Sequence, residues 1–209
     1  DHFKTMIDGL DVHFIHQRSA EDDAMPLLLT HGWPGSFVEF ANLIGPLTDP
    51  AAYGGDAADA FHVVIPSLPG YGFSGKPAET GYNPERMADV LAGLMERLGY
   101  DRYGAQGGDW GAIISRVLAA NYGDRLIGLH SNFMRGGPPP PGDADPEEGL
   151  SAEELERMRE RAEAFSEGRG YSAIQGTKPQ TLGYGLNDSP AGLAAWIVEK
   201  FQGWSDNDG

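Results

Sequence analysis

The residues best placed to do chemistry are five in a row, Gly107-Gly108-Asp109-Trp110-Gly111. They follow the small-x-nucleophile-x-small spacing of a nucleophile elbow, with an aspartate in the place of the more common serine. An elbow holds its central residue in a strained turn between a strand and a helix, and small residues on both sides let these elements pass closely. An alternative is that Asp109 only caps the helix that follows it.

A nucleophilic aspartate forms an ester when its carboxylate displaces a leaving group at an sp³ carbon, and water then attacks the ester carbonyl. The second step creates an oxyanion at the carboxyl group of Asp109, and two hydrogen-bond donors must stabilise it. The backbone amide of Trp110, directly after the nucleophile, is one predicted donor. The backbone amide of Trp33, in a loop after another expected strand, is the second.

The loop that carries Trp33 has the sequence His31-Gly32-Trp33-Pro34. Pro34 stiffens the turn without using the Trp33 amide, because proline restricts φ and removes only its own donor. We expect His31, Gly32 and Pro34 to order this loop, and His31 not to be the general base, since a base must lie beside the ester. The alternative for Trp33 and Trp110 is aromatic lining of a core or pocket, which is compatible with amides that act as donors.

Another glycine-rich segment, with Gly70, Gly72 and Gly75, has the spacing of a dinucleotide-binding fingerprint. The fingerprint needs a helix to begin within it, but Lys76 and Pro77 follow here. We therefore reject a dinucleotide site and expect a loop that lies over the reactive aspartate.

Short apolar runs that alternate with helical patterns must position these loops. Such an alternation predicts a mostly parallel sheet with helices on both faces. The loops that follow residues 30, 65 and 103, at the ends of the third, fourth and fifth strands, would then meet at one edge of the sheet. We expect a hairpin of residues 3–7 and 12–16, further strands at residues 27–30, 61–65, 101–103 and 126–130, and helices at residues 37–43, 84–98 and 112–121.

The sequence changes in character at residue 135, where a segment rich in proline and glycine begins. We expect residues 1–134 to form the core and residues 135–209 to form a stiff linker with a helical lid. The pattern Ser151-x-x-Glu154 predicts a capping box that starts one lid helix. Ser189, followed by proline, predicts the start of another.

The composition is that of an acidic globular protein of 209 residues with a formal net charge of −16. A chain this acidic repels phosphate backbones, which argues against nucleic acid as a partner. Since cysteine is absent, disulfides, thiol catalysis and cysteine-bound metals are excluded. The sequence contains no apolar run near the ~20 residues that span a bilayer and no signal-peptide pattern. We expect a cytoplasmic location, although residue 1 is not methionine and a membrane anchor upstream stays compatible with the sequence.

Several segments, in their order and spacing, resemble epoxide hydrolases of the α/β-hydrolase fold, and others resemble the microsomal and juvenile-hormone type of these enzymes. The resemblance covers nearly the whole chain. It implies an α/β-hydrolase fold and the hydrolysis of a small apolar epoxide by water to a vicinal diol, without a metal or cofactor. The segments are residues 31–36, 66–74 and 107–111 for the enzymes in general, and residues 3–16, 174–181 and 186–201 for the type.

The same resemblance implies roles for single residues. Asp109 matches the nucleophile, and Trp33 and Trp110 match the residues whose amides form the oxyanion hole. Tyr171 matches a lid tyrosine that donates a hydrogen bond to the epoxide oxygen, and a neutral phenol can protonate a developing alkoxide. The alternative for Tyr171 is packing within the lid, and Tyr184 is a weaker match to a lid tyrosine.

The family pattern also contains a catalytic histidine with an acidic partner after the lid. The chain has six histidines, all before the lid and none in that context, at positions 2, 13, 16, 31, 62 and 130. We therefore expect a piece of a longer enzyme that can form the ester on Asp109 but does not turn over.

Two other functions fit the same elbow. A haloalkane dehalogenase shares the aspartate and the ester but binds a halide through tryptophan or asparagine NH groups, and the match of Tyr171 argues against it. A hydrolase-like module without catalytic activity is the other. The sequence leaves the oligomeric state open.

Overall fold

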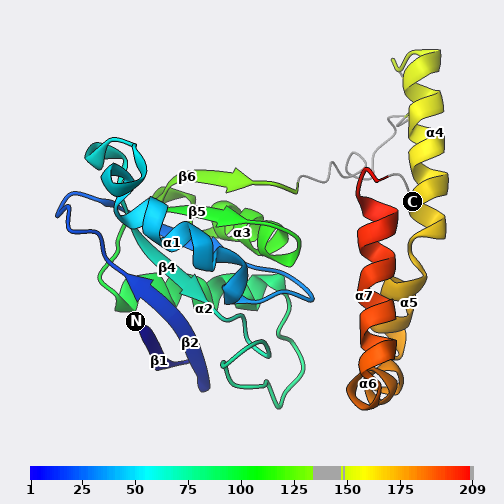
Figure 1. Cartoon of the computed structure of the whole chain (residues 1–209), viewed down its shortest axis with the longest axis horizontal. Helices are drawn as coiled ribbons and strands as arrows, with labels where there is room; N and C mark the ends of the chain where they lie inside the picture. The colour runs from blue at the N-terminus through cyan, green and yellow to red at the C-terminus, as the bar shows by residue number, and fades with distance from the viewer. Residues whose placement is uncertain (134–146, 148, 208–209) are drawn as a thin grey trace. The chain divides into compact units, whose positions relative to one another are not determined.

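The protein is described from a computed structural model that covers residues 1–133, 147 and 149–207. The chain divides into two compact units, Asp1–Gly136 (unit 1) and Gly137–Gly209 (unit 2). Unit 1 is a sheet with helices, and the described part of unit 2 is helical (Figure 1). The predicted linker, which begins at residue 135, lies outside the described residues.

The centre of unit 1 is a six-stranded sheet (Figure 1). Its strands are β1 (His2–Ile7), β2 (Leu10–Gln17), β3 (Met25–Thr30), β4 (Phe61–Pro66), β5 (Tyr103–Gly107) and β6 (Leu126–Ser131). Their order across the sheet is β1-β2-β4-β3-β5-β6, in which β4, β3, β5 and β6 are parallel and the β1–β2 hairpin joins antiparallel to β4. The prediction of a mostly parallel sheet is confirmed.

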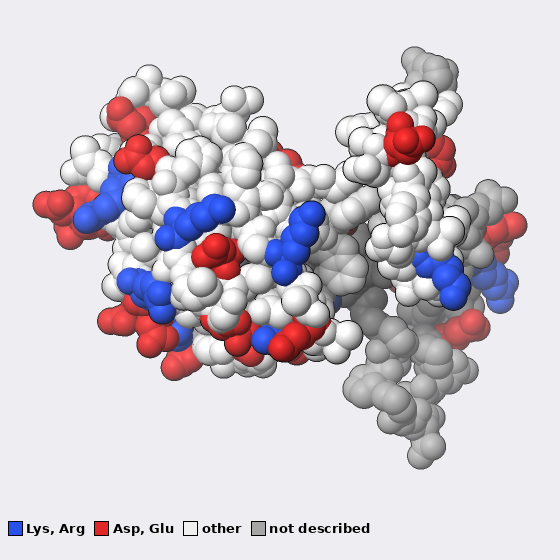
Figure 2. Space-filling view, turned by 90° about the horizontal axis from the view of Figure 1, so that it is seen from below, with Lys and Arg blue, Asp and Glu red and all other residues white. Residues whose placement is uncertain are grey.

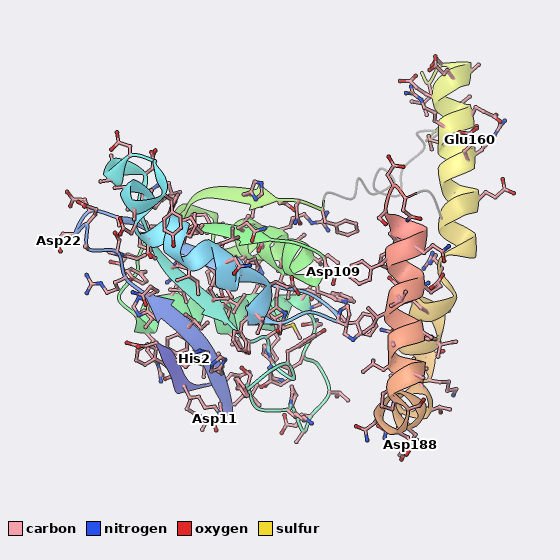
Figure 3. The ribbon with its side chains drawn as sticks, viewed as in Figure 1. His2, Asp11, Asp22, Asp109, Glu160 and Asp188 are labelled. Atoms are coloured by element: carbon pink, nitrogen blue, oxygen red, sulfur yellow. The ribbon has the colours of Figure 1, made fainter. Side chains whose placement is uncertain are left out.

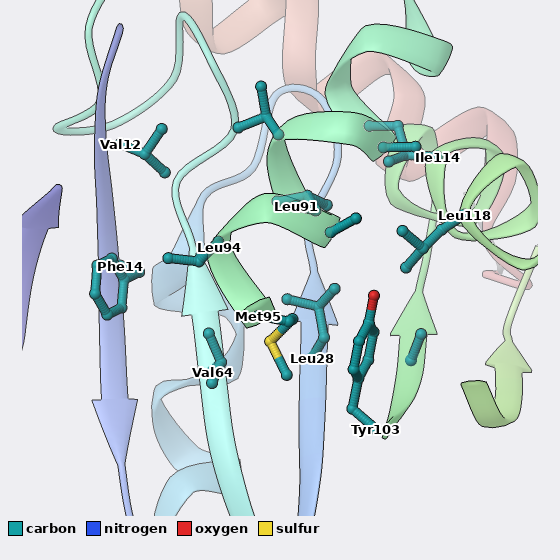
Figure 4. Packing of buried hydrophobic residues seen from close by; sticks show 14 of the residues in the cluster. Val12, Phe14, Leu28, Val64, Leu91, Leu94, Met95, Tyr103, Ile114 and Leu118 are labelled. Carbon is teal, nitrogen blue, oxygen red and sulfur yellow. The ribbon is translucent and has the colours of Figure 1, made fainter. Parts of the chain in front are cut away.

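Helices cover both faces of this sheet because neighbouring residues of a strand point to opposite sides. Leu28 and Val64 pack into the larger buried cluster, with α2 (Pro84–Arg97) and α3 (Trp110–Asn121) (Figure 4). Leu29 and Val63 pack into a second cluster, with α1 (Ala41–Thr48) on the other side. The continuous apolar runs of the central strands are thus buried on both faces, as parallel strands require.

The strand that leads to the elbow differs from the prediction. The sequence predicts residues 101–103, but β5 is Tyr103–Gly107 and contains residues assigned to the turn. The reason is that glycine and alanine have weak strand propensity, so the pattern hides a strand whose neighbours select small residues. A Cβ on Gly104 would lie only 3.3 Å from Leu27 Cδ1 of β3. Pairing with β3 and β6 therefore decides the conformation.

Two helical segments of unit 1 start at a side chain that accepts a backbone amide. Ser36 caps a 3₁₀ helix, η1 (Phe37–Phe40), which leads into α1, so the helical segment extends past the predicted residue 43. Asn83 Oδ1 accepts the Arg86 amide at 3.0 Å and starts α2. The helix ends before Gly99, whose φ of 81° lies in the left-handed region. Further 3₁₀ turns are η2 (Pro50–Tyr53), η3 (Ala57–Asp59) and η4 (Gly123–Arg125).

The described part of unit 2 contains α4 (Ala152–Glu167), α5 (Gly170–Thr177), α6 (Pro179–Asp188) and α7 (Pro190–Trp204). The predicted capping box is confirmed: the Ser151 amide donates to Glu154 Oε2 at 2.8 Å, and the Glu154 amide donates to Ser151 Oγ at 3.3 Å. Ser189 Oγ accepts the Gly192 amide at 3.0 Å and starts α7, as predicted. The function of this unit as a lid stays a prediction.

Figure 2 shows how charged side chains are distributed on one face of the protein. On the face of unit 1 shown in Figure 2, acidic and basic side chains are interspersed and form no continuous basic stripe. Among the described residues, no helix combines the length and the apolar character needed to cross a bilayer. The same residues contain no group of three or more histidine or acidic side chains arranged to hold a metal ion.

Candidate active site

Asp109 lies in the tight turn between β5 and α3, at the carboxyl edge of the parallel strands (Figure 3). Its backbone has φ 49° and ψ −124°, and among the described non-glycine residues only Asp8, in the hairpin turn, shares a positive φ. A residue other than glycine adopts this conformation at a cost of order 1–3 kcal/mol, and such strain concentrates at functional sites. The elbow conformation predicted from the sequence is therefore present.

The glycines on either side of Asp109 are required by the packing. A Cβ on Gly107 would overlap the carbonyl oxygen of Gly111, and a Cβ on Gly111 would overlap the carbonyl oxygen of Thr30 at the end of β3. Backbone atoms cannot move aside as the end of a flexible side chain can. Glycine is thus needed two residues before and two residues after Asp109, which is the spacing that the sequence motif shows.

The side chain of Asp109 does not cap α3. Asp109 occupies the N-cap position, but its carboxylate makes no capping hydrogen bond to the helix. Instead Oδ1 accepts the backbone N–H of Trp33 at 2.8 Å. Gly32 makes room for this contact, because a Cβ there would overlap the Asp109 carboxylate. The alternative in which Asp109 is only a helix cap is wrong, because the strained backbone directs the carboxylate to the neighbouring loop.

His31 joins the Trp33 loop to the loop after β4. Its side chain is buried, Nδ1 lies 3.1 Å from the carbonyl oxygen of Gly32, and Nε2 accepts the Leu68 amide at 3.1 Å. Since Nε2 is an acceptor, the proton of the neutral ring is on Nδ1. Burial lowers the pKa of His31, partly offset by the bond to Gly32, so the ring is neutral at pH 7. This geometry suits a loop-ordering residue, and Pro34 follows through a cis peptide bond.

The glycine-rich loop after β4 completes the same edge. Gly70 and Gly72 have φ of 88° and 50°, and no helix starts within this loop, so it lacks the helix N-terminus that a dinucleotide fingerprint needs. The Tyr71 ring packs edge-on against His31 at 5.2 Å between centroids. Burial raises the pKa of the Tyr71 phenol, and the Asp109 carboxylate raises it further. The predicted convergence of the three loops is confirmed.

The other predicted site residues lie on two different units. Trp110 is the first residue of α3 and has an exposed side chain. Tyr171 is in α5 of unit 2, where its ring packs edge-on against Trp204 at 5.4 Å and Lys200 Nζ lies 4.7 Å from its centre. Tyr184, in α6, is 69% exposed. The roles of Trp33 and Trp110 as oxyanion donors and of Tyr171 as acid stay predictions.

Two residues beside Asp109 were missed in the sequence. Asn132 follows β6, and a Cβ on Gly108 would lie 2.5 Å from its Oδ1, so its side chain packs on the elbow. The other loops were identified because they directly follow a parallel strand, and the same criterion could have identified Asn132. Glu39 forms a capping box with Ser36. The Ser-x-x-Glu spacing that predicts the box at Ser151 is also present there.

Two family models match the chain. One, described as the alpha/beta hydrolase fold, matches residues 25–207, and the other, described as the epoxide hydrolase N terminus, matches residues 1–40. A protein of Stigmatella aurantiaca named putative epoxide hydrolase is 53% identical over 210 residues, which cover 99% of this chain and 46% of that protein. Juvenile hormone epoxide hydrolase 1 of Ctenocephalides felis is 41% identical over 98% of this chain and 46% of its own length.

A solved structure shows the same similarity in three dimensions. The epoxide hydrolase of Aspergillus niger superposes with a TM-score of 0.78 at 38% sequence identity, over 95% of this chain and 51% of that chain. The chain thus spans about half the length of the relatives that it matches.

Proposed function

The chain belongs to the epoxide hydrolases of the α/β-hydrolase fold, and on that basis we propose that it carries the nucleophile of a site that converts an epoxide and water into a vicinal diol. The reaction proceeds through an ester on Asp109. One observation carries this proposal: at a strained elbow, the Asp109 carboxylate accepts the Trp33 amide at 2.8 Å.

In the first step the two oxygens of Asp109 have different roles. Oδ1 is held by the Trp33 amide, which leaves Oδ2 to attack an epoxide carbon. The new carbon–oxygen bond forms as the ring carbon–oxygen bond breaks, and the ring oxygen takes a proton. We assign this proton to the Tyr171 phenol, because a neutral phenol can protonate a developing alkoxide. The contacts of its ring with Trp204 and Lys200 support a fixed orientation.

In the second step water adds to the ester carbonyl of Asp109. Negative charge develops on Oδ1, the oxygen that the Trp33 amide already contacts. The amide of Trp110, next in the chain, is the second proposed donor. A donor that is in place before charge develops needs no reorganisation, and removal of one such donor costs about 10²–10³-fold in rate in other enzymes. Collapse of the adduct releases the diol and restores the carboxylate.

The second step needs a base that takes a proton from water. Five of the six histidines already have hydrogen-bond partners elsewhere in unit 1. His31 accepts the Leu68 amide, and His62 accepts the Ser19 amide. His2 is hydrogen-bonded to His13, which also bonds to Ser67, and His16 is hydrogen-bonded to Tyr100. The sixth, His130, lies on β6. We propose that the catalytic histidine and its acidic partner come from sequence outside residues 1–209, and that unit 2 is a lid over the site.

The proposed substrate class is a small apolar epoxide, with water as the second reactant and without a metal or cofactor. The exposed Trp110 side chain, 46% accessible, offers an apolar surface next to the nucleophile. The net charge of −16 argues against anionic partners such as nucleic acid.

The decisive experiment uses the protein expressed from its complete gene. Incubated with styrene oxide, it should release the diol, and quenched samples should contain a peptide with Asp109 that is heavier by one substrate. Asp109→Asn should lower diol release by about 10⁴-fold or more, because no other group can form the ester. Residues 1–209 alone should gain the adduct without releasing diol.

The alternatives predict other results. A haloalkane dehalogenase would release halide from a haloalkane and leave styrene oxide unchanged. A module without catalytic activity would form no adduct at all. Diol release that survives in Asp109→Asn would contradict the proposed nucleophile.

A further inference from the structure

The loop that supplies the Trp33 amide is followed directly by a capping box. The Ser36 amide donates to Glu39 Oε1 at 3.1 Å, and Ser36 Oγ accepts the Val38 amide at 3.3 Å. These two hydrogen bonds start η1, whose cap residue Ser36 is three residues after Trp33. The geometry of a helix start is thus coupled to the geometry of a proposed oxyanion donor.

Glu39 also lies against the residue before the cap. A Cβ on Gly35 would overlap Glu39 Oε1, so the carboxylate occupies the space that a side chain at position 35 would fill. Within one loop, a single carboxylate oxygen therefore touches the backbone at both Gly35 and Ser36. Residue 35 must be glycine for this contact to form.

The element that carries Glu39 is anchored in the core. Phe40, the next residue, is buried in the second cluster, and Phe37 packs against the same cluster. At the other end of the loop, His31 is buried and bonded to Leu68. Between these two anchors, the Glu39 carboxylate holds the backbone of residues 35 and 36.

We propose that Glu39 is a positioning residue: its carboxylate fixes the loop between His31 and η1 and thereby sets the position of the Trp33 amide that stabilises the oxyanion. This inference rests on the proposed function of Asp109. Glu39 acts through Ser36 and Gly35.

The charge of Glu39 cannot be what helps the reaction. Partial burial raises the pKa of its carboxyl group, the Ser36 amide lowers it, and Asp109 raises it again, so Glu39 and Asp109 repel one another. A second negative charge near a developing oxyanion opposes its formation. Glu39 therefore contributes through its hydrogen-bond acceptor oxygen and the length of its side chain, and glutamine has both.

The test is single-turnover kinetics on the protein expressed from its complete gene, with the ester on Asp109 followed by mass spectrometry. Glu39→Ala should slow hydrolysis of the ester by about 10- to 100-fold, because a displacement of about 1 Å costs up to about 100-fold. Glu39→Gln should stay within about threefold of the parent rate. Glu39→Asp, which keeps the charge but is one methylene shorter, should fall between them.

Unit 2 supplies a matched control. Glu154 forms the same Ser-x-x-Glu capping box on α4, which carries no proposed site residue. Glu154→Ala should destabilise its helix as Glu39→Ala does, but ester hydrolysis should stay within about twofold of the parent rate. The comparison separates loss of a helix cap from displacement of Trp33.

The inference is overturned if Glu39→Ala hydrolyses the ester within twofold of the parent rate, or if Glu39→Gln is slowed as much as Glu39→Ala. If Glu39→Ala does not fold, Glu39→Asp takes its place: ester hydrolysis at the parent rate in Glu39→Asp also overturns the inference. If the parent protein forms no ester on Asp109, the proposed function fails and this inference falls with it. An ester that forms and hydrolyses independently of Glu39 leaves the proposed function intact.

Discussion

The two units hold their candidate site residues in different ways. Among the described residues, every buried apolar side chain lies in unit 1, and Asp109 stands on a turn formed by two elements of that core. In unit 2 no residue of α5, α6 or α7 is buried. Tyr171 is there held through contacts of its ring with Trp204 and Lys200.

These two kinds of support should determine how much variation the surroundings of Asp109 and the surroundings of Tyr171 can each accept. The position of Asp109 is set by backbone atoms in contact, so one added carbon is enough to break it. The position of Tyr171 is set by side chains on helices with many exposed apolar residues. Substitutions around Tyr171 should therefore displace it gradually, each by a small amount. Exposed apolar side chains on unit 2 include Ile174, Leu193, Val198, Phe201 and Trp204.

The largest contrast should come from the same substitution made in both units. Gly111→Ala places a Cβ against the carbonyl oxygen of Thr30 and should destabilise unit 1 by about 3 kcal/mol or more. Gly183→Ala, in α6, meets no atom within 4 Å and should stabilise its helix by about 0.5–1 kcal/mol. Urea unfolding followed by hydrogen exchange of peptides from α3 and α6 measures both free energies.

A Gly111→Ala protein whose unit 1 unfolds within about 1 kcal/mol of the parent would contradict the close approach of α3 to β3. Gly111→Ala should lower the free energy of unfolding and Gly183→Ala should raise it. This opposite sign would exclude a general effect of added methyl groups.

The next contrast concerns the two tyrosines of unit 2. In the complete protein, Tyr171→Phe should slow ester formation by about 100-fold, the low end for loss of a general acid. Tyr184→Phe, at an exposed position, should change the rate by less than about twofold. Stopped-flow tryptophan fluorescence together with quenched mass spectrometry measures ester formation in both.

Equal rates in the two variants would show that Tyr171 is only packed within unit 2. A loss confined to ester hydrolysis would assign its hydroxyl to the second step and contradict its proposed role as the acid that protonates the ring oxygen.

Most of the fold follows from local sequence signals. The apolar runs of β3, β4 and β6, the cap at Asn83 and the capping box at Ser151 each encode their element within a few residues. The fold class and the similarity to epoxide hydrolases, predicted from motif order, are confirmed. The elbow was predictable because its glycines are required by backbone contacts that any such turn makes.

What the sequence could not supply depends on contacts between distant segments. β5 is hidden because its glycines are selected by close contacts, Gly104 with β3 and Gly107 with α3, and not by strand propensity. The hydrogen bond between Trp33 and Asp109 joins residues 76 apart in the chain, so a local sequence pattern could not exclude a helix cap at Asp109. Asn132 and Glu39 stand in recognisable sequence patterns, but only the fold shows that both lie beside the elbow.

The smallest contrast is in the response to pH. His31 is buried with Nε2 as an acceptor, and burial lowers its pKa below the ordinary value of about 6.5. Below pH 6.5 the unfolded chain therefore binds more protons than the folded unit 1, and the free energy of unfolding falls as pH falls. One histidine contributes at most about 1.4 kcal/mol per pH unit. Unit 2 contains no histidine and should not respond in this range.

Hydrogen exchange of peptides from each unit between pH 7.5 and 5.5, corrected for the intrinsic rate, measures this difference. His31→Gln keeps an acceptor for the Leu68 amide but cannot be protonated, so its unit 1 should show a shallower dependence than the parent. Burial also lowers the pKa of His13, His16 and His62, and these should keep part of the slope. An equal loss of protection in both units would mean that acidification acts through the general net charge, and the buried acceptor at His31 would then not be the cause.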